Sequence, residues 1–215
     1  MRSLRSTNVP LLVIMATDRP ESVPSTLADA SDALIWKGFS GYDFSAYRLG
    51  LEEVGSRSPG ADVFVMNDSV FGPFGDFEQL VARAPWRMTG FTSSALGENH
   101  IQSYAFILQS VDAGLLADLA DALLPRHAFD IAGDVILCQE LALARVASRR
   151  MDVGSYWHNG RSGSDPMLEM PLDLLDAGLP FLKKSLLGKM RSFQDAQTVR
   201  KRLVDLGHPV ESIAP

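Results

Sequence analysis

Cysteine is nearly absent from this sequence, since Cys138 is the only one among 215 residues. A single thiol excludes a disulfide framework within the chain and any zinc site built from several cysteines. Long apolar runs are missing too: the stretch 9–16 falls well short of the about 20 residues that a membrane-spanning helix needs. Asp18, Arg19 and Pro20 interrupt that stretch before any cleavage site, which argues against a secretory signal. We therefore expect a cytoplasmic protein without disulfides.

Basic residues are fewer than acidic ones: the sequence has 20 Lys and Arg residues and 26 Asp and Glu residues, which gives a net charge of −6. Recognition of nucleic-acid phosphates relies on a basic surface, so a dedicated nucleic-acid-binding function is excluded. The glycine fingerprints of P-loop and Rossmann nucleotide enzymes are missing, which disfavours both classes. The remaining composition, 46% hydrophobic and 21% charged, is that of an ordinary globular domain that folds without a metal.

Short apolar runs alternate with helix-length segments over the first half of the chain. Runs 11–16, 33–36 and 62–66 predict strands, and the segments 20–30 and 44–54 between them predict helices. A strand that is apolar throughout is typical of one buried on both faces. The alternation predicts an α/β fold in which a mostly parallel sheet is flanked by helices.

The later part of the chain predicts more of both elements: strands at 86–92, 102–109 and 152–157, and helices at 112–124 and 134–150. These later strands would add a mixed edge to the sheet. Residues 159–166 concentrate Gly, Ser, Asn and Pro, which predicts a flexible loop. We assign residues 1–190 to one domain and residues 191–215 to a helical C-terminal tail.

Polar residues stand where three of the predicted strands end. In order, they are Thr17 and Asp18, then Gly41, Tyr42 and Asp43, then Asn67, Asp68 and Ser69. Ligands of open α/β sheets bind outside the carboxyl ends of the strands, so these residues are candidates for a binding site. Helix capping is the competing interpretation, above all for Asp43. The third group is not followed directly by a helix, which favours ligand contact there.

Four segments of the sequence carry recognisable motifs: GYDFSAYRLGL from Gly41, VFVMNDSVFGPFGDFEQL around Asn67, GFTSS with HIQSYAFILQ from Gly90, and AGLPFLKKSLL from Ala177. In this order and spacing they resemble the rhamnan synthesis protein F family of bacterial glycosyltransferases. The family's most distinctive segment is an apolar strand that ends in Asn-Asp-Ser and continues with an aromatic residue and Gly-Pro. Together the four segments cover most of residues 10–190.

The resemblance implies a GT-A-like fold, in which a nucleotide-sugar donor lies across the strand ends. The position of the family's acidic motif implies that Asp68 acts on the donor diphosphate and contacts a divalent cation, Mg²⁺ or Mn²⁺. Asn and Ser are weaker metal ligands than a second carboxylate, so the sequence leaves metal dependence open. The other residues expected to bind the donor are Thr17, Asp18, Gly41, Tyr42, Asp43, Asn67 and Ser69.

The resemblance also places an acceptor-side acid at Glu140. Inverting sugar transfer needs a carboxylate that takes the proton of the acceptor hydroxyl. Apolar neighbours such as Leu141 would raise the pKa of Glu140 toward that role, whereas an exposed helical glutamate is the competing interpretation. His100 and Gln102 are expected to contact the acceptor, with a purely structural histidine as an equal alternative. The expected acceptor is a saccharide, free or lipid-linked, of bacterial cell-surface polysaccharide.

One departure from the family concerns the start of the domain. A GT-A-like domain usually opens with a further βα unit, and only ten residues precede Leu11. The expected fold therefore lacks that first unit. Three alternatives follow: the nucleotide site is minimal, or a partner, such as another glycosyltransferase chain, completes it, or activity is lost and the protein is a non-catalytic nucleotide-sugar or saccharide-binding module.

Basic residues gather near the end of the chain, at Lys183, Lys184, Lys189, Arg191, Arg200, Lys201 and Arg202. A basic amphipathic helix there would rest on anionic lipid at the inner membrane face. A solvated helix face is the competing interpretation.

Overall fold

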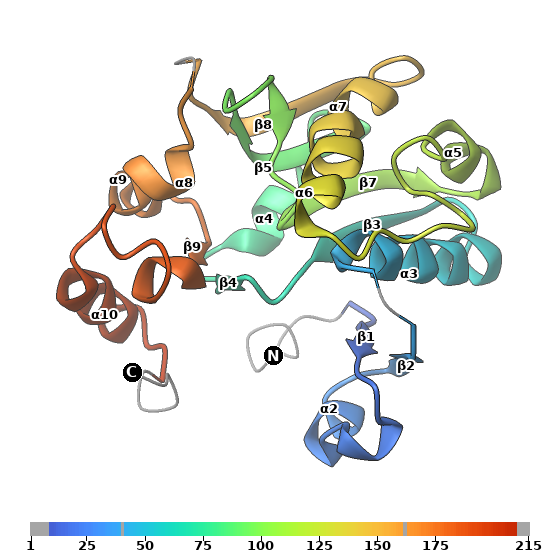
Figure 1. Cartoon of the computed structure of the whole chain (residues 1–215), viewed down its shortest axis with the longest axis horizontal. Helices are drawn as coiled ribbons and strands as arrows, with labels where there is room; N and C mark the ends of the chain where they lie inside the picture. The colour runs from blue at the N-terminus through green and yellow to red at the C-terminus, as the bar shows by residue number, and fades with distance from the viewer. Residues whose placement is uncertain (1–8, 40, 161–162, 210–215) are drawn as a thin grey trace.

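The computed structural model describes residues 9–39, 41–160 and 163–209. Its centre is a five-stranded sheet (Figure 1). The strands are β3 (Ala61–Met66), β5 (Met88–Ser94), β6 (His100–Ile101), β7 (Ala105–Val111) and β8 (Val153–His158). Strand β7 lies between β3 and β5 and is antiparallel to both, β6 is antiparallel to β5, and β8 pairs with β5 in parallel.

The expectation of a mostly parallel, GT-A-like sheet is therefore wrong. Between β5 and β7 the chain passes only through the short strand β6 and its flanking turns. Parallel neighbours need a long crossover, usually a helix, so this short connection reverses the chain and makes the pairing antiparallel.

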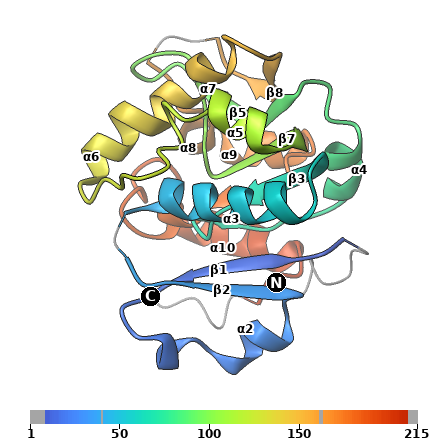
Figure 2. The same ribbon diagram turned by 90° about the vertical axis from the view of Figure 1, so that its right-hand side faces the viewer.

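A second, separate sheet pairs β1 (Leu12–Ala16) with β2 (Ala33–Lys37) in parallel. The short helices η1 (Pro20–Ser22) and α2 (Ser25–Asp29) connect the two strands. Figure 2 shows this sheet between α2 and the long helix α3 (Asp43–Arg57), apart from the five-stranded sheet. The first two predicted strands thus exist and are parallel, but they do not join the central sheet.

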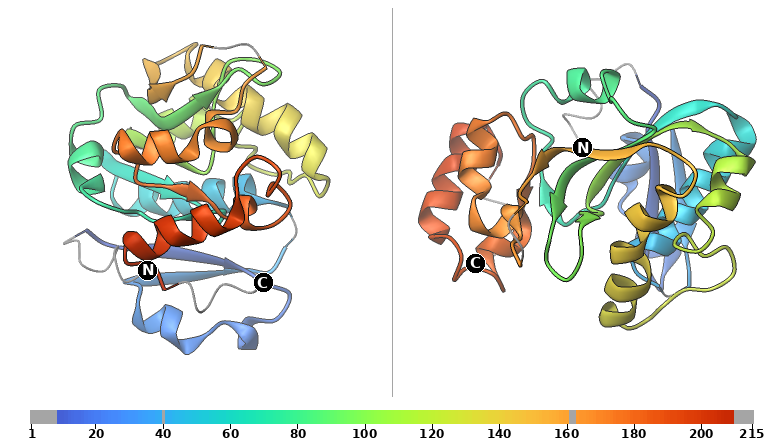
Figure 3. Two further views of the ribbon diagram at one scale, coloured as in Figure 1. Left: turned by 90° about the vertical axis from the view of Figure 1, so that its left-hand side faces the viewer. Right: turned by 90° about the horizontal axis from the view of Figure 1, so that it is seen from above.

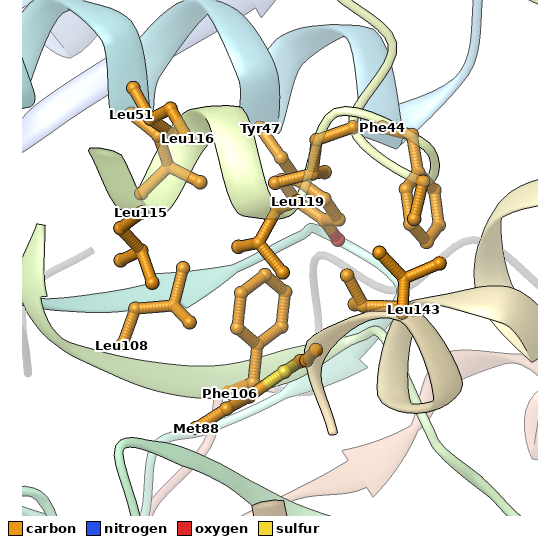
Figure 4. Close-up of a cluster of buried hydrophobic side chains, with 14 of the residues drawn as sticks. Phe44, Tyr47, Leu51, Met88, Phe106, Leu108, Leu115, Leu116, Leu119 and Leu143 are labelled. Atoms are coloured by element: carbon orange, nitrogen blue, oxygen red, sulfur yellow. The ribbon is translucent and has the colours of Figure 1, made fainter. Parts of the chain in front are cut away.

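Helix α3 follows from apolar residues that recur every three or four positions, and it covers the residues expected at 44–54. Phe44, Tyr47 and Leu51 point from it into the largest hydrophobic core, where they meet Phe106 and Leu108 of β7 (Figure 4). The rings of Tyr47 and Phe106 lie edge to face with centroids 5.5 Å apart. Burial of side chains of this size stabilises the fold by about 1.5–3 kcal/mol each, and it fixes α3 on the sheet.

The helices between residues 113 and 147 pack around this core, and they divide more finely than expected. The segment predicted at 112–124 contains α5 (Ala113–Asp118), which Asp112 caps by accepting a hydrogen bond from the Leu115 amide at 2.7 Å. The segment predicted at 134–150 corresponds to α6 (Ala132–Val135), which starts two residues earlier, a π-helical stretch (Ile136–Glu140) and α7 (Leu141–Ala147). Helix α4 (Phe77–Ala82) joins β4 (Val70–Phe71) to β5.

The C-terminal part folds back onto the segment after β3. It comprises α8 (Pro166–Glu169), α9 (Pro171–Asp176), β9 (Leu182–Lys183), a 3-10 turn (Lys184–Leu187) and α10 (Ala196–Asp205). Strand β9 pairs antiparallel with β4, and α10 buries Val199 and Leu203 in the adjoining core. Figure 3 shows these helices at one side of the sheet, away from α6 and α7. The predicted boundary at residue 190 stays a prediction, and residues 210–215 of the expected tail lie outside the described residues.

Three of the basic residues named near the end of the chain form ion pairs with nearby carboxylates: Lys183 with Asp165, Lys201 with Asp205 and Arg202 with Asp176. Part of the basic character is thus neutralised within the C-terminal part, and contact with lipid stays a prediction. Over the described ranges, every helix is too short or too polar to cross a bilayer.

Gly72 allows the close approach of β4 and β9. Its φ is +118°, and a Cβ at this position would collide with the carbonyl oxygen of Pro180. We expect Gly72→Ala to lower the free energy of unfolding by roughly 2–4 kcal/mol, because backbone on both sides must move. The matched control is Gly75→Ala, where φ is +59° and no atom lies within 4 Å of the added Cβ. Its expected cost is roughly 1 kcal/mol. Urea denaturation of both variants tests this, and equal costs would contradict the packing argument.

Candidate functional site

The carboxyl ends of three strands meet at one edge of the central sheet. Strands β3 and β5 are each antiparallel to β7, so they run in the same direction, and β8 runs parallel to β5. The amino end of β7 lies at the same edge. The residues after β3 and those before β7 are therefore neighbours, as the hydrogen bond from the Asn67 amide to the Tyr104 carbonyl shows at 3.0 Å. This edge carries most of the polar residues that the sequence singled out.

Asn67 links the end of β3 to the start of α3. Its Nδ2 donates to Asp43 Oδ2 at 2.7 Å, and its Oδ1 accepts from the Ser69 amide at 3.0 Å and from Ser69 Oγ at 2.5 Å. Asp43 is the first residue of α3, and its side chain bonds to Asn67 rather than capping its own helix. The structure therefore brings together three of the predicted donor residues.

Glu140 comes to the same edge from the π-helical stretch. Its Oε1 accepts hydrogen bonds from the Ser103 amide at 3.2 Å and from Ser103 Oγ at 2.9 Å. The competing interpretation, a freely solvated helical glutamate, does not describe this carboxylate. π-Helical turns are rare and frequent at functional sites, because the extra residue re-aims the side chains of one turn.

Carboxylates crowd this edge, and their charges influence one another. The pKa of Asp43 is raised, first because the carboxyl is partly withdrawn from water and then because Asp68 and Glu140 carry like charge. The hydrogen bond from Asn67 and the charge of Lys37 oppose this rise. Asp43, Asp68 and Glu140, which are distant in sequence, thus form one acidic cluster.

Tyr47 supports the acidic cluster through Ser103. Its hydroxyl donates to the Ser103 carbonyl at 2.9 Å, in the residue that holds Glu140. Burial raises the pKa of Tyr47 well above its ordinary value, and the charges of Asp43 and Glu140 raise it further. Tyr47 therefore stays protonated and serves as a hydrogen-bond donor.

Lys37 is a functional candidate that the sequence analysis missed. It ends β2, it is only 2% exposed, and its ammonium donates to the Gly41 carbonyl. Burial lowers its pKa, while Asp43 and Asp130 favour the charged form. The ammonium also lies 5.0 Å from the centre of the Phe39 ring. Lys37 brings positive charge to the acidic cluster and holds the turn before α3, and a lysine directly after an apolar strand was its sequence signal.

Other predicted residues lie in different surroundings. Thr17 bonds within its own loop, with its Oγ1 2.8 Å from Ser22 Oγ, and Asp18 is exposed next to it. His100 is buried, with Nδ1 2.8 Å from the Glu98 carbonyl oxygen. Gly41 and Tyr42 precede the cluster, and the Tyr42 side chain is exposed. Their roles in binding stay predictions.

Gln102 belongs to a buried network that the sequence did not reveal. It accepts from Thr92 Oγ1 at 2.7 Å and donates to Asp165 Oδ1 at 3.0 Å. Asp165 also accepts from Lys183 Nζ at 2.9 Å. This network ties β5 to α8 and β9, so Gln102 has a structural role whatever it binds. The expected flexible loop at 159–166 ends in this network, and its residues 161–162 lie outside the described residues.

A divalent cation fits this edge only together with a ligand. In the described part of the chain, no three His, Cys, Asp or Glu side chains are grouped so as to hold a metal ion. Mg²⁺ is often bound through one or two carboxylates plus substrate phosphates and water. Asp68, which belongs to the acidic cluster, is suited to bind Mg²⁺ together with substrate phosphates.

The fold and this edge define an α/β protein in which carboxylate and amide side chains converge at the strand ends. The model of the family described as rhamnan synthesis protein F matches residues 11–115. The match bears out the predicted resemblance over residues 11–115, just under half of the chain, and it links this part of the chain to rhamnan polysaccharide synthesis. No curated protein and no solved structure matches the chain. The matched region contains Asp43, Asp68 and Ser103, while Glu140 lies beyond it.

The raised pKa of Asp43 predicts a pH-dependent contribution to stability. A carboxyl whose pKa is higher in the folded state binds more protons there, so the free energy of unfolding falls as pH rises from the ordinary Asp value of 3.8 through the raised one. Asp43→Asn removes this titration and keeps a partner for Asn67. We expect the variant to gain stability relative to the wild type as pH rises through that window.

Urea denaturation at a series of pH values from about 4 to 7 measures this difference. Asp76→Asn, an exposed carboxylate before α4, serves as the control and should show no such trend. A stability difference for Asp43→Asn that is the same at every pH would contradict the electrostatic account of the cluster.

Proposed function

We propose that this protein is a glycosyltransferase of bacterial cell-surface polysaccharide synthesis that transfers a sugar from a nucleotide-sugar donor to a saccharide acceptor. The convergence of Asp43, Asp68 and Glu140 at the strand ends is the observation that supports this proposal most strongly. The three residues come from separate segments, and their like charges oppose one another. An arrangement that costs stability in this way is typical of a functional site.

The donor is proposed to lie against the segment Asn67–Ser69. Asn67 is held on both sides by hydrogen bonds, so the loop after β3 is fixed before a ligand arrives. Preorganisation of this kind lowers the cost of binding. When bound at Asp68 together with the donor, Mg²⁺ or Mn²⁺ would supply positive charge to the leaving diphosphate.

Glu140 is proposed to take the proton of the acceptor hydroxyl. The hydroxyl oxygen attacks the anomeric carbon of the donor sugar, the bond to the diphosphate breaks, and the proton passes to the carboxylate. Two hydrogen bonds from Ser103 hold Glu140 Oε1, which fixes the direction of the carboxylate.

Donor binding is the first prediction of this proposal. Calorimetry with UDP-, GDP- and dTDP-sugars, with and without Mn²⁺, should identify a donor that binds below millimolar concentration. Asp68→Asn should weaken binding of that donor at least tenfold, most strongly when Mn²⁺ is present. Asp76→Asn, on the exposed start of α4, is the matched control. If no nucleotide-sugar binds at millimolar concentration, the proposal fails.

The role of Glu140 gives a separate prediction. Glu140→Gln should leave donor affinity nearly unchanged and lower the rate of transfer by about 10²–10⁴, the usual loss on removal of a general base. Glu78→Gln, on the exposed face of α4, is the control for loss of one carboxylate. Transfer at the wild-type rate by Glu140→Gln would show that another group is the base. Donor binding without any turnover in the wild type would indicate a non-catalytic binding module.

A further inference from the structure

A groove lies between helix α4 and the C-terminal part of the chain. It consists of two adjoining hollows of about 390 and 450 Å³, a size usual for small-molecule sites. The hollows share five residues, among them Gln79 and Leu206, so they are continuous. Asp43, Asp68 and Glu140 line neither hollow, which makes this groove distinct from the acidic cluster. We name it the α4 groove.

One wall of the α4 groove is aromatic. Tyr156 and Trp157 of β8 line it, together with Phe74, which precedes α4. All three side chains are half-buried, so part of each stays accessible to a ligand. The Tyr156 hydroxyl donates to the Leu80 carbonyl of α4, and the centroids of the Tyr156 and Trp157 rings are 5.8 Å apart. Tyr156 is thus fixed before a ligand arrives, which lowers the cost of binding.

The part of the groove that α4 supplies is polar. Gln79 and Arg83 line it, and because they stand four positions apart, their side chains lie on one face of the helix. Both are exposed, and over the described ranges neither side chain forms a hydrogen bond or an ion pair with another residue. The amide donates and accepts hydrogen bonds, and the guanidinium donates them in a planar fork. The α4 groove therefore offers free hydrogen-bonding groups close to aromatic rings.

This combination of surfaces excludes several classes of ligand. A lipid chain would cover Gln79 and Arg83 without giving them hydrogen bonds, which costs free energy. A polyanion needs several cations, whereas Arg83 is the single Lys or Arg among the described lining residues, which include Asp76 and Glu78. A neutral saccharide presents both surfaces that the groove requires: C–H faces that pack on aromatic rings, and hydroxyl groups that bond to amide and guanidinium groups.

The larger hollow also has an apolar part, which narrows the choice of sugar. Leu175, Leu179 and Leu206 line it. Most hexoses carry a hydroxyl on C6, and leucine side chains leave such a group without a partner. Rhamnose carries a methyl group on C6 instead, which fits apolar surroundings. The match of residues 11–115 to the rhamnan synthesis protein F family links the chain to a polymer of this sugar.

We propose that the α4 groove binds a stretch of rhamnan chain, with a rhamnose ring on Trp157, methyl groups toward the leucines, and hydroxyls bonded to Gln79 and Arg83. The inference rests on the proposed function only in taking this chain as the acceptor. Trp157 is the next-to-last residue of β8, which ends at the edge that carries the acidic cluster. The groove thus holds the acceptor at a second place, beyond its reacting end, and favours acceptors long enough to reach both.

Binding is measured with a rhamnohexaose that carries a fluorophore at its reducing end, prepared in the D and in the L series. Each is titrated with the full chain and followed by fluorescence anisotropy. We expect saturable binding in one of the two series with a Kd below about 1 mM. Mannohexaose of that series differs only by a hydroxyl on each C6, and it should bind at least fivefold more weakly.

Two double variants locate the site. Gln79→Ala combined with Arg83→Ala should weaken rhamnohexaose binding at least tenfold, because the hydrogen-bonding side chains on α4 are lost. The matched control combines Gln197→Ala with Arg191→Ala, since neither residue lines the groove. Arg191 and Gln197 are exposed like Gln79 and Arg83, so both double variants should fold as the wild type does.

Tryptophan emission gives a readout that does not depend on the label. Unlabelled rhamnohexaose should change the emission of the wild type and of Trp36→Phe, because Trp157 is present in both. The same saccharide should leave the emission of Trp157→Phe unchanged.

Four results would overturn the proposal: absence of saturable rhamnohexaose binding in both series up to about 1 mM, equal binding of mannohexaose, equal affinity of the two double variants, or an emission change that persists in Trp157→Phe. Donor binding is measured separately, so the two failures can be told apart. If rhamnohexaose binds at the groove and no nucleotide-sugar binds, the proposed function fails and the rhamnan site stands. If a nucleotide-sugar binds and rhamnohexaose does not, this inference alone fails.

Discussion

The packing of α3 on the central sheet is the contact on which the rest of the candidate site depends. Tyr47 reaches from the helix to the Ser103 carbonyl, and Ser103 in turn holds Glu140. The same helix begins at Asp43, which receives the hydrogen bond from Asn67. A shift of α3 along the sheet would therefore disturb Asp43, its partner Asn67, and Ser103, which holds Glu140. The hydrophobic core fixes the polar geometry.

The price of that geometry is electrostatic. Asp68 and Glu140 bring like charge to Asp43, and the hydrogen bond from Asn67 and the charge of Lys37 oppose the resulting rise in the pKa of Asp43. A chain selected for stability alone would separate these groups, because like charges near one another disfavour the folded state. Their presence together at the strand ends is typical of a site whose ligand changes the local balance of charge when it binds. Stability and activity oppose each other at such places.

The sequence predicted those features that depend on local pattern. Asn67 and Asp68 follow an apolar strand, and Asp43 begins a helix with regular apolar spacing. Their positions at the ends of elements could therefore be predicted from the sequence. The insertion of β7 between β3 and β5, antiparallel to both, could not be predicted, because the order of strands in a sheet depends on contacts between residues that are distant in sequence. Ser103 was missed for another reason: its role comes from Glu140, which is distant in sequence, and the motif around Ser103 does not record that contact.

The pairing of β4 with β9 has a consequence for biosynthesis. Val70 directly follows the Asn67–Ser69 segment, yet its partner Lys183 is made about 110 residues later. The Ser69 carbonyl accepts a hydrogen bond from the Lys184 amide at 2.9 Å, and Lys184 is also synthesised late. On the ribosome, the loop after β3 stays without these contacts until residues 183 and 184 have emerged. Until then, the acidic loop and the unpaired edge of the apolar strand β4 are both exposed to solvent. This is the stage of synthesis at which a chaperone would have the most apolar surface to shield.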